Sequence, residues 1–370
     1  MTNNLTVQIH KKIQETGPIT IAEFMAICLL DPNNGYYPTR DPFGENGDFI
    51  TSPEISQMFG ELIGLWCMQT WYDMGRPYKI NLIEYGPGRG IMMQDILRSA
   101  KLDQEFLSAI NITLIEASPV LEAIQAETLY KCPCPVNWAS DIREIPYMPA
   151  IILGNEFLDC LPIKQFIQTN KKLGLKGWRE RLVTIKNNKL VFGISPIELP
   201  EWQEKDFPTS HYKADQNDLL ELCPAYSQII DQLKKRSLKN NIRALFIDYG
   251  DTSTDFGDTL QSLKAHKKMD VFSDLGKSDL TTRVNFEYLT DLSIANNLPV
   301  TEVITQGDFL NNMGIKVRAK NLLKAKPEAK NKILRQLNKL TSKNEMGELF
   351  KVICFQSKKL ELPLGFENIR

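Results

Sequence analysis

The sequence predicts an α/β protein whose core is an open sheet of seven strands with helices on both faces. Two observations predict this class. Strand-like apolar runs alternate with helix-patterned segments from residue 79 onward, as in sheets whose parallel strands are joined by helical crossovers. The first run, 79–85, leads directly into a turn with glycine at every second position, which lets a backbone approach a ligand closely. Ligands of such sheets bind beyond the carboxyl ends of the strands, so we expect the functional site there.

The glycine turn indicates which kind of ligand binds. Residues 82–90 read Leu-Ile-Glu-Tyr-Gly-Pro-Gly-Arg-Gly. A dinucleotide-binding turn reads G-x-G-x-x-G, but here the third glycine comes one residue early. Alternate glycines preceded by an acid resemble the first motif of class I methyltransferases, whose cofactor, S-adenosylmethionine, carries a sulfonium and an α-amino group and no phosphate. We therefore expect this cofactor to contact Glu84, Gly86, Gly88 and Gly90, and an ordinary tight turn is the alternative.

Carboxylates follow the next two strands. The second strand, 112–116, ends in Glu116, which is placed to accept hydrogen bonds from both ribose hydroxyls of a nucleoside cofactor. After a short third strand, 136–138, Asp141 could offer its carboxylate to the adenine amino group. A solvated loop acid is an equally good interpretation of Asp141.

The fourth strand, 150–155, runs into three polar residues. Because ligands lie beyond the carboxyl ends of the strands, Asn155, Glu156 and Asp159 should face the reactive end of the cofactor. A fifth strand, 244–249, contains Asp248, which is a weaker site candidate. The last strands of the sheet are predicted at 299–305 and 348–356.

An N-terminal helical part precedes the sheet. Leu5, Ile9 and Ile13 share one helix face, and a second amphipathic helix is predicted to start with Ser52 as N-cap and Pro53 as its first residue. A long glycine-bearing loop runs into that helix just ahead of the cofactor turn, which favours a lid over the cofactor. A helix that merely packs on the sheet is the alternative.

Between the fourth and fifth strands the pattern changes to alternation typical of strands. Stretches at 163–168, 178–185 and 189–194 predict a β-meander, followed by a helix near 219–239. We therefore divide the chain into an N-terminal helical lid segment (1–78), a cofactor-binding core (79–160 and 240–358) and an insertion (161–239). The insertion is well placed to form a platform for a protein substrate, and a structural extension is the alternative.

The composition bounds the remaining function classes. The 370 residues are 42% hydrophobic and 24% charged with a formal net charge of −1, which argues against a dedicated nucleic-acid binder. Seven scattered cysteines without a C-x-x-C pair and three distant histidines indicate neither a disulfide framework nor a metal site. The N-terminal residues lack the pattern of a signal or transit peptide, and no apolar run is long enough to span a membrane. We expect a cytoplasmic protein, and the oligomeric state stays open.

One segment is strongly basic. Residues 316–340 carry nine Lys or Arg against one Glu, with Ile333, Leu337 and Leu340 on one helix face. A basic amphipathic helix could bind an acidic partner or RNA, but a solvated outer face is the favoured interpretation.

Several sequence blocks occur in an order that resembles the MidA family of class I methyltransferases, over about residues 8–356. The blocks are 47–57, 84–90, 116–120, 154–159, 246–250, 257–261 and 305–310. The resemblance implies a Rossmann-like core and S-adenosylmethionine as cofactor. The family occurs in bacteria and in mitochondria, where its members act as complex I assembly factors. It further implies a protein substrate, with symmetric dimethylarginine formed on a core subunit of respiratory complex I.

An arginine substrate narrows the choice of catalytic residues. A guanidinium is best held by carboxylates, and methyl transfer to its nitrogen needs a proton acceptor. Glu54 and Glu156 are therefore the first acids to test, with Asp159 beside them, although each could be a plain helix-start or loop carboxylate. Two other readings stay open: an assembly protein that binds the cofactor but catalyses little, and a methyltransferase acting on a small molecule or RNA.

Overall fold

The computed structural model describes residues 4–44, 47–169, 177–200, 204 and 207–367. Its largest sheet has the strand order β15-β16-β10-β5-β2-β3-β4, and β14 lies beside β10. Neighbouring strands from β10 to β4 are parallel, whereas β16 is antiparallel to both β10 and β15. The strands are β2 (Ile80–Tyr85), β3 (Ile110–Ile115), β4 (Val136–Ala139), β5 (Ala150–Asn155), β10 (Ile242–Asp251), β14 (Val284–Asn285), β15 (Ile304–Thr305) and β16 (Phe350–Gln356).

This sheet therefore has eight strands where seven were predicted. The additional strand, β14, has two residues, and so short a strand leaves no alternation in the sequence. The predicted strand 299–305 is reduced to β15 at its end. The hydroxyl of Thr301, instead of a backbone carbonyl, accepts the Cys354 N–H, which interrupts the regular ladder there.

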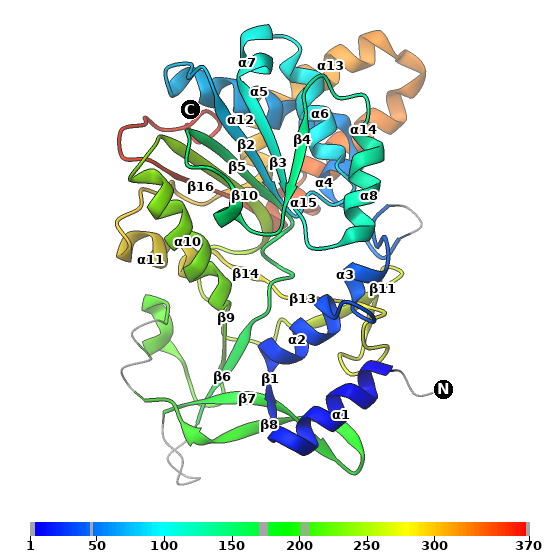
Figure 1. Cartoon of the computed structure of the whole chain (residues 1–370), viewed down its shortest axis with the longest axis vertical. Helices are drawn as coiled ribbons and strands as arrows, with labels where there is room; N and C mark the ends of the chain where they lie inside the picture. The colour runs from blue at the N-terminus through cyan, green and yellow to red at the C-terminus, as the bar shows by residue number, and fades with distance from the viewer. Residues whose placement is uncertain (1–3, 45–46, 170–176, 201–203, 205–206, 368–370) are drawn as a thin grey trace.

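Helices cover both faces of the sheet (Figure 1). Successive residues of a strand point to opposite faces, so Leu82 and Ile83 of β2 belong to two separate apolar cores. The core around Leu82 includes α5 (Gln57–Asp73), α6 (Ile91–Ala100), α7 (Gln104–Ala109), α12 (Gln306–Asn312), α13 (Ile315–Ala325), α14 (Lys330–Thr341) and α15 (Met346–Leu349). The core around Ile83 includes α10 (Pro224–Ser237) and α11 (Phe286–Ala295). Across the described part of the chain, no helix has both the length and the apolar character to cross a bilayer.

A second sheet of five strands lies at the lower end of the molecule in Figure 1. The predicted strands of the insertion are present as β6 (Lys164–Gln168), β7 (Trp178–Lys186) and β8 (Lys189–Glu198), each antiparallel to the next. Two more strands join them: β1 (Ile19–Thr20), between α1 (Asn4–Thr16) and α2 (Ile21–Leu30), pairs with β7, and β9 (Leu219–Leu222) pairs with β6. The helix predicted from 219 starts only at Pro224, since proline has no N–H to donate and suits a first helical turn.

The helix predicted to start with Ser52 as N-cap and Pro53 as its first residue starts one residue earlier and is in fact two helices. α4 covers Ser52–Ile55 with Thr51 as its N-cap, and α5 starts at Gln57. The break lies at Ser56, whose backbone is extended (φ −159°, ψ 135°) and whose hydroxyl accepts the Met58 N–H. The apolar face of the predicted amphipathic helix is buried on both sides of the break and includes Ile55, Met58, Phe59, Leu62, Ile63 and Trp66.

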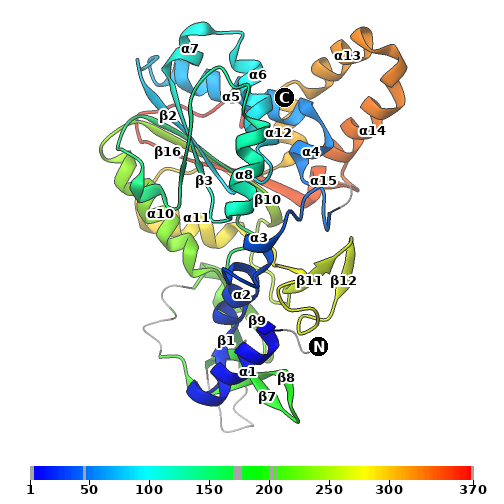
Figure 2. The ribbon, with the colours of Figure 1, turned by 45° about the vertical axis from the view of Figure 1, so that its right-hand side comes forward.

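A small hairpin holds the loop that leads into α4. The strands β11 (Gln261–Lys264), β12 (Lys267–Met269) and β13 (Asp279–Thr281) form a third sheet, which lies below α3 (Tyr36–Thr39) in Figure 2. The backbone N–H of Ala265 donates to Asp48 Oδ1 over 2.7 Å, and that of His266 donates to the Asp48 carbonyl over 3.2 Å. The loop before α4 is therefore tied to a part of the chain more than 200 residues away.

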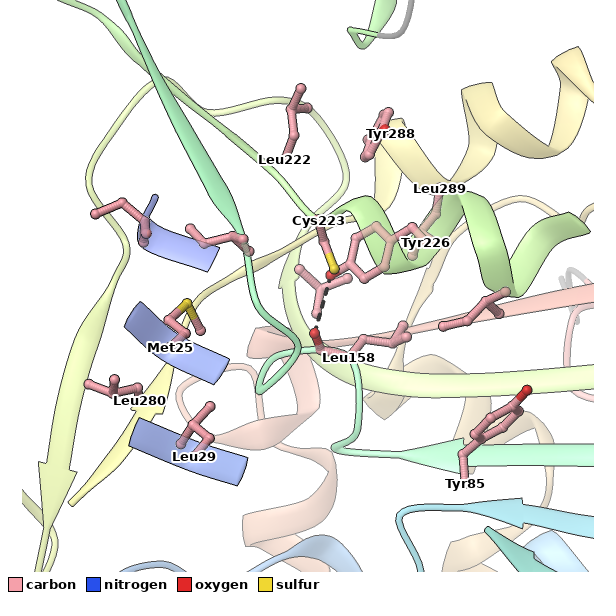
Figure 3. Close-up of a cluster of buried hydrophobic side chains, with 14 of the residues drawn as sticks. Met25, Leu29, Tyr85, Leu158, Leu222, Cys223, Tyr226, Leu280, Tyr288 and Leu289 are labelled. Atoms are coloured by element: carbon pink, nitrogen blue, oxygen red, sulfur yellow. Dashed lines mark hydrogen bonds between the residues drawn. The ribbon is translucent and has the colours of Figure 1, made fainter. Parts of the chain in front are cut away.

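A buried apolar cluster connects the upper and lower parts of the molecule (Figure 3). Met25 and Leu29 of α2 lie near Leu280 of β13, and Leu158, just beyond β5, lies beside Tyr226 of α10. The Tyr226 hydroxyl donates to the Leu158 carbonyl over 3.4 Å. The cluster thus joins the residues that follow β5 to elements from three other regions of the chain, α2, β13 and α10.

Candidate functional site

A cavity of about 860 Å³ lies at the carboxyl ends of β2, β3, β4 and β5. The residues that follow these strands line it: Gly86 and Gly88, Glu116, Asp141, Glu156 and Asp159. This is where an open parallel sheet is expected to bind its ligand. Of the ten site residues predicted from the sequence, six therefore line one cavity.

The glycine turn has a backbone that other residues adopt only with strain. Gly86, Gly88 and Gly90 have φ values of +57°, +54° and +79°. A Cβ atom at position 86 would also lie 2.9 Å from Cδ2 of Phe157. The turn therefore requires glycine for its conformation and, at Gly86, for the close approach of a neighbouring ring.

Behind the turn, a smaller hollow of about 40 Å³ is lined by Glu54, Glu84, Asn155 and Glu156. Three buried oxygens here accept no hydrogen bond from the described residues: Glu54 Oε2, Glu84 Oε2 and Asn155 Oδ1. A buried acceptor without a partner costs about 1–3 kcal/mol. Burial raises the pKa of Glu84 to about 8. The hollow is therefore suited to a cationic group with several N–H donors.

Glu116 is held in a defined orientation. Its Oε1 accepts the backbone N–H groups of Ala117 and Ser118 over 2.8 and 2.7 Å, and its Oε2 accepts Nε2 of Gln125 over 2.8 Å. A carboxylate offers about four acceptor positions, so one remains for the cavity. Gln125 Nε2 also donates to the Gly88 carbonyl, which couples Glu116 to the glycine turn.

Four acids lie close together beside the turn: Glu156, Asp159, Asp248 and Asp279. Glu156, Asp159 and Asp279 line the cavity, and Asp248 is fully buried. Burial raises the pKa of Glu156 and of Asp279 to about 7. Burial and then the charges of the other three raise the pKa of Asp159 well above its usual range. The group is therefore poised to hold protons or a cation near neutral pH.

Each acid of this group is oriented by donors. Glu156 Oε1 accepts the Ser52 N–H over 2.7 Å and Nδ2 of Asn155 over 3.0 Å. The Tyr37 hydroxyl donates to Asp279 Oδ1 over 3.0 Å. Glu156 also has a φ of +53°, which costs a non-glycine residue about 1–3 kcal/mol and is characteristic of functional sites.

Comparison with known proteins identifies the family. The model of the Methyltransf_28 family, described as S-adenosyl-L-methionine-dependent methyltransferases, matches residues 62–304. The chain belongs to this family. The mitochondrial protein arginine methyltransferase NDUFAF7 of Mus musculus is 37% identical over 92% of this chain and 81% of its own length. The human protein of the same name is 36% identical over 92% of this chain and 80% of its own length.

A solved structure shows the same fold. A protein from Burkholderia thailandensis, crystallised with S-adenosyl-homocysteine, superposes with a TM-score of 0.84 at 24% identity, over 99% of this chain and 94% of that one. The predicted family and cofactor are thereby confirmed: this protein is an S-adenosylmethionine-dependent methyltransferase with an α/β fold. The free acceptors of Glu84 and Asn155 fit the α-ammonium of that cofactor, which has three N–H donors.

Two predicted site residues of the methyltransferase have partners of their own. Arg143 donates to both carboxylate oxygens of Asp141 over 2.8 and 2.9 Å and lowers the pKa of that acid. Glu54 forms an ion pair with Arg89 at 3.6 Å and lines the smaller hollow, and the lining of the large cavity does not include it. Asp141 lines the cavity, but its contacts match the loop-acid interpretation more closely than a free acceptor for adenine.

The sequence did not single out Asp279 of this methyltransferase. It lies 120 residues after Asp159, at the start of the three-residue strand β13, within no recognisable motif. The available signal was an acid directly before the short stretch Leu-Thr-Thr, whose β-branched threonines favour a strand. Only the hairpin fold brings it to Tyr37 and to the other acids.

The prediction of a cytoplasmic protein is wrong, because the curated relatives of the methyltransferase carry the designation mitochondrial. The composition cannot distinguish a cytoplasmic protein from a mitochondrial one. Free cysteines indicate a reducing environment, and more than one compartment provides it.

Proposed function

We propose that this methyltransferase modifies a guanidinium nitrogen of arginine in a protein substrate. The observation that carries the proposal is the group of four acids next to the glycine turn, three of which line the cavity. A guanidinium is always cationic and presents five N–H donors in one plane, which matches carboxylate acceptors. The names of the curated relatives, protein arginine methyltransferases, support the same substrate class.

The cofactor contacts follow from the acceptors around the turn. We assign Glu84 and Asn155 to the α-ammonium of S-adenosylmethionine, and the remaining acceptor position of Glu116 to one of its two ribose hydroxyls. Gly86, Gly88 and Gly90 give the cofactor access to the backbone. Asp141 borders the adenine side of the cavity together with Ile142. We place Glu54 with the cofactor because it shares the smaller hollow with Glu84.

The acids supply positioning and a proton acceptor. The bound cofactor provides an electrophilic methyl group on sulfur. Glu156 and Asp159 hold the guanidinium in line with it by charge-assisted hydrogen bonds. As the new N–C bond forms and the S–C bond breaks, the nitrogen loses a proton. Glu156 accepts it, and a pKa of about 7 suits that role at neutral pH.

A lid over the cofactor is supported by aromatic residues ahead of α4. Phe43, Phe49 and Ile50 line the cavity, and the rings of Phe43 and Phe49 are 5.1 Å apart. A Cβ atom on Gly88 would lie 3.5 Å from the Phe43 ring. Because Asp48 is held by the β11–β12 hairpin, that hairpin sets the position of the lid.

We also propose that the predicted division of the chain holds in function. The lid segment is 1–78, the core is 79–160 and 240–358, and the insertion is 161–239, which serves as a substrate platform. The pairing of β1 with β7 supports a platform that moves together with the N-terminal helices. From the resemblance to the MidA family, we propose that the protein substrate is a subunit of respiratory complex I.

Transfer of labelled methyl groups tests the proposal. The enzyme is incubated with S-adenosylmethionine that is labelled on the methyl group. One reaction contains a protein extract and a separate reaction contains RNA. The protein is then hydrolysed to amino acids. We expect label in methylated arginine. Asp159→Asn should abolish labelling, whereas calorimetry should show that it still binds the cofactor. Asp291→Asn is the control and should label normally, because Asp291 accepts the backbone N–H of Thr209 and is not among the four acids.

The alternatives give different results. Label in RNA or in lysine contradicts arginine methylation. Cofactor binding without label in any acceptor favours an assembly protein that catalyses little.

A further inference from the structure

A wide groove lies next to the active-site cavity, between α14 and the helices that follow the lid. It measures about 960 Å³, and its walls include α4, the start of α6 and the two basic helices α13 and α14. Figure 2 shows α13 and α14 standing out from the body beside α4. The basic segment predicted as one helix is two, because Pro327 lies between them.

The positive charge of the groove is not neutralised by the protein. Lys326, Lys332, Arg335 and Lys339 line it and are exposed, and we call this the basic groove. Among the described residues, no ion pair includes any of these four, whereas Arg318 of α13 pairs with Glu61 at 2.7 Å. The chain as a whole has a net charge of only −1, so this surface is much more positive than the protein's average.

The two acids in the wall do not cancel this charge. Asp95 pairs with Arg98 at 2.8 Å, and Glu54 pairs with Arg89 at 3.6 Å. The floor carries apolar side chains, among them Ile50, Pro53, Ile55 and Ile333. An occupant should therefore combine negative charge with some apolar surface.

The basic groove leads to the active site. Ile50 and Lys339 line both the groove and the large cavity. Glu54 lines both the groove and the small hollow that contains Glu84 and Glu156. The side chain of Gln336 donates to the Ile55 carbonyl, which ties α14 to the end of α4 beside the site. A chain lying in the groove can thus place one residue in the cavity.

We propose that the basic groove binds an acidic stretch of the protein substrate next to the arginine that is methylated. This inference rests on the proposed function. The groove supplies cations for the flanking carboxylates, and the acids Glu156, Asp159 and Asp279 receive the guanidinium. The two surfaces have opposite charge, so they select a substrate segment in which an arginine adjoins acidic residues.

The lining argues for a peptide and against RNA. Proteins that bind single-stranded nucleic acid stack bases on aromatic side chains, and no Phe, Tyr or Trp is among the described residues that line the basic groove.

Fluorescence anisotropy with labelled peptides tests the inference. Each peptide has a single arginine flanked on one side by glutamates, glutamines or lysines. We expect the glutamate peptide to bind most tightly and to weaken with salt. The double variant Lys332→Glu/Arg335→Glu should weaken its binding by about tenfold, as expected when two attractive charges become repulsive. Affinity for S-adenosylmethionine should not change.

The matched control reverses two charges in the same segment outside the groove. Lys316 and Lys320 of α13 are exposed and do not line it. Lys316→Glu/Lys320→Glu should leave peptide affinity within about twofold, as surface charges away from a contact contribute little. Equal losses in both double variants, or no loss in either, would overturn the proposed docking surface. So would an RNA oligonucleotide that binds the groove more tightly than the glutamate peptide.

Methyl transfer to the same peptides separates the two proposals. Groove-dependent binding without label in arginine supports the docking surface and contradicts the proposed function. Arginine labelling that is independent of the flanking charge supports the proposed function and overturns the docking surface.

Discussion

The side-chain amide of Gln125 donates to both the Glu116 carboxylate and the Gly88 carbonyl, each over 2.8 Å. Its oxygen accepts the indole N–H of Trp138 over 2.9 Å. Gln125 is fully buried in α8 (Pro119–Thr128). One side chain thus connects the glycine turn after β2, the acid after β3 and a residue of β4.

Replacing Gln125 with alanine should weaken cofactor binding by about tenfold and lower the free energy of unfolding by about 1–3 kcal/mol, because three half-buried polar groups lose a partner. Calorimetry and urea unfolding measure the two effects. Gln94→Ala is the control, since Gln94 donates to the Thr128 carbonyl at a more exposed position. Similar cofactor affinity in both variants would contradict the role of Gln125.

Gly88→Val should abolish measurable S-adenosylmethionine binding. Position 88 has a φ of +54° and lines the cavity, so a branched side chain would be strained and would fill the space of the ligand. Gly17→Val shares the strain, with a φ of +85° and no atom within 4 Å of the added Cβ. Each substitution should cost about 1–2 kcal/mol of stability. Only the first should affect binding, and retained binding in Gly88→Val would mean that the cofactor lies elsewhere.

Glu84→Gln should flatten the pH dependence of stability of the cofactor-free protein. Burial raises the pKa of Glu84 from 4.5 to about 8, so between these values the folded protein binds more protons than the unfolded chain. The free energy of unfolding therefore falls as pH rises through this window. The variant should be about 1 kcal/mol more stable than the wild type at pH 8.

The same change should weaken cofactor binding by about tenfold or more, since a neutral amide replaces a charged partner of the ammonium. Urea unfolding at several pH values and calorimetry check both effects. If the variant and the wild type showed the same dependence of stability on pH, the pKa of Glu84 would not be raised in the folded protein.

Tyr37→Phe should move the acidic limb of the pH profile of kcat/KM to higher pH. The Tyr37 hydroxyl donates to Asp279 and lowers the pKa of that acid against the effect of burial, so its loss lets the pKa rise. Fewer molecules then carry the charge that binds arginine at pH 7. Tyr36→Phe is the control, because the Tyr36 hydroxyl donates to Asp48 and not to Asp279. The pH profile of this variant should match that of the wild type. A common shift in both variants would argue against Asp279 as a substrate contact.

Local patterns predicted the elements that hold the cofactor. β2 begins and ends within about one residue of the expected positions, because an apolar strand and the glycine turn that ends it are specified by neighbouring residues. Patterns failed where long-range pairing decides. The start of the predicted helix 219–239 became β9 because β6 offers it a partner, and β1 exists only through its pairing with β7.

The sequence by itself determined the α/β core, the glycine turn and the carboxylates that follow its strands, since each depends on residues close together in the chain. Only the tertiary structure decided which acids meet. Asp279 reaches Asp159 through a hairpin, Glu156 is held by the Ser52 N–H, and the basic groove joins the cavity at Lys339. Electrostatic function depends on distances of a few ångströms between groups far apart in sequence, and packing of the folded chain sets those distances.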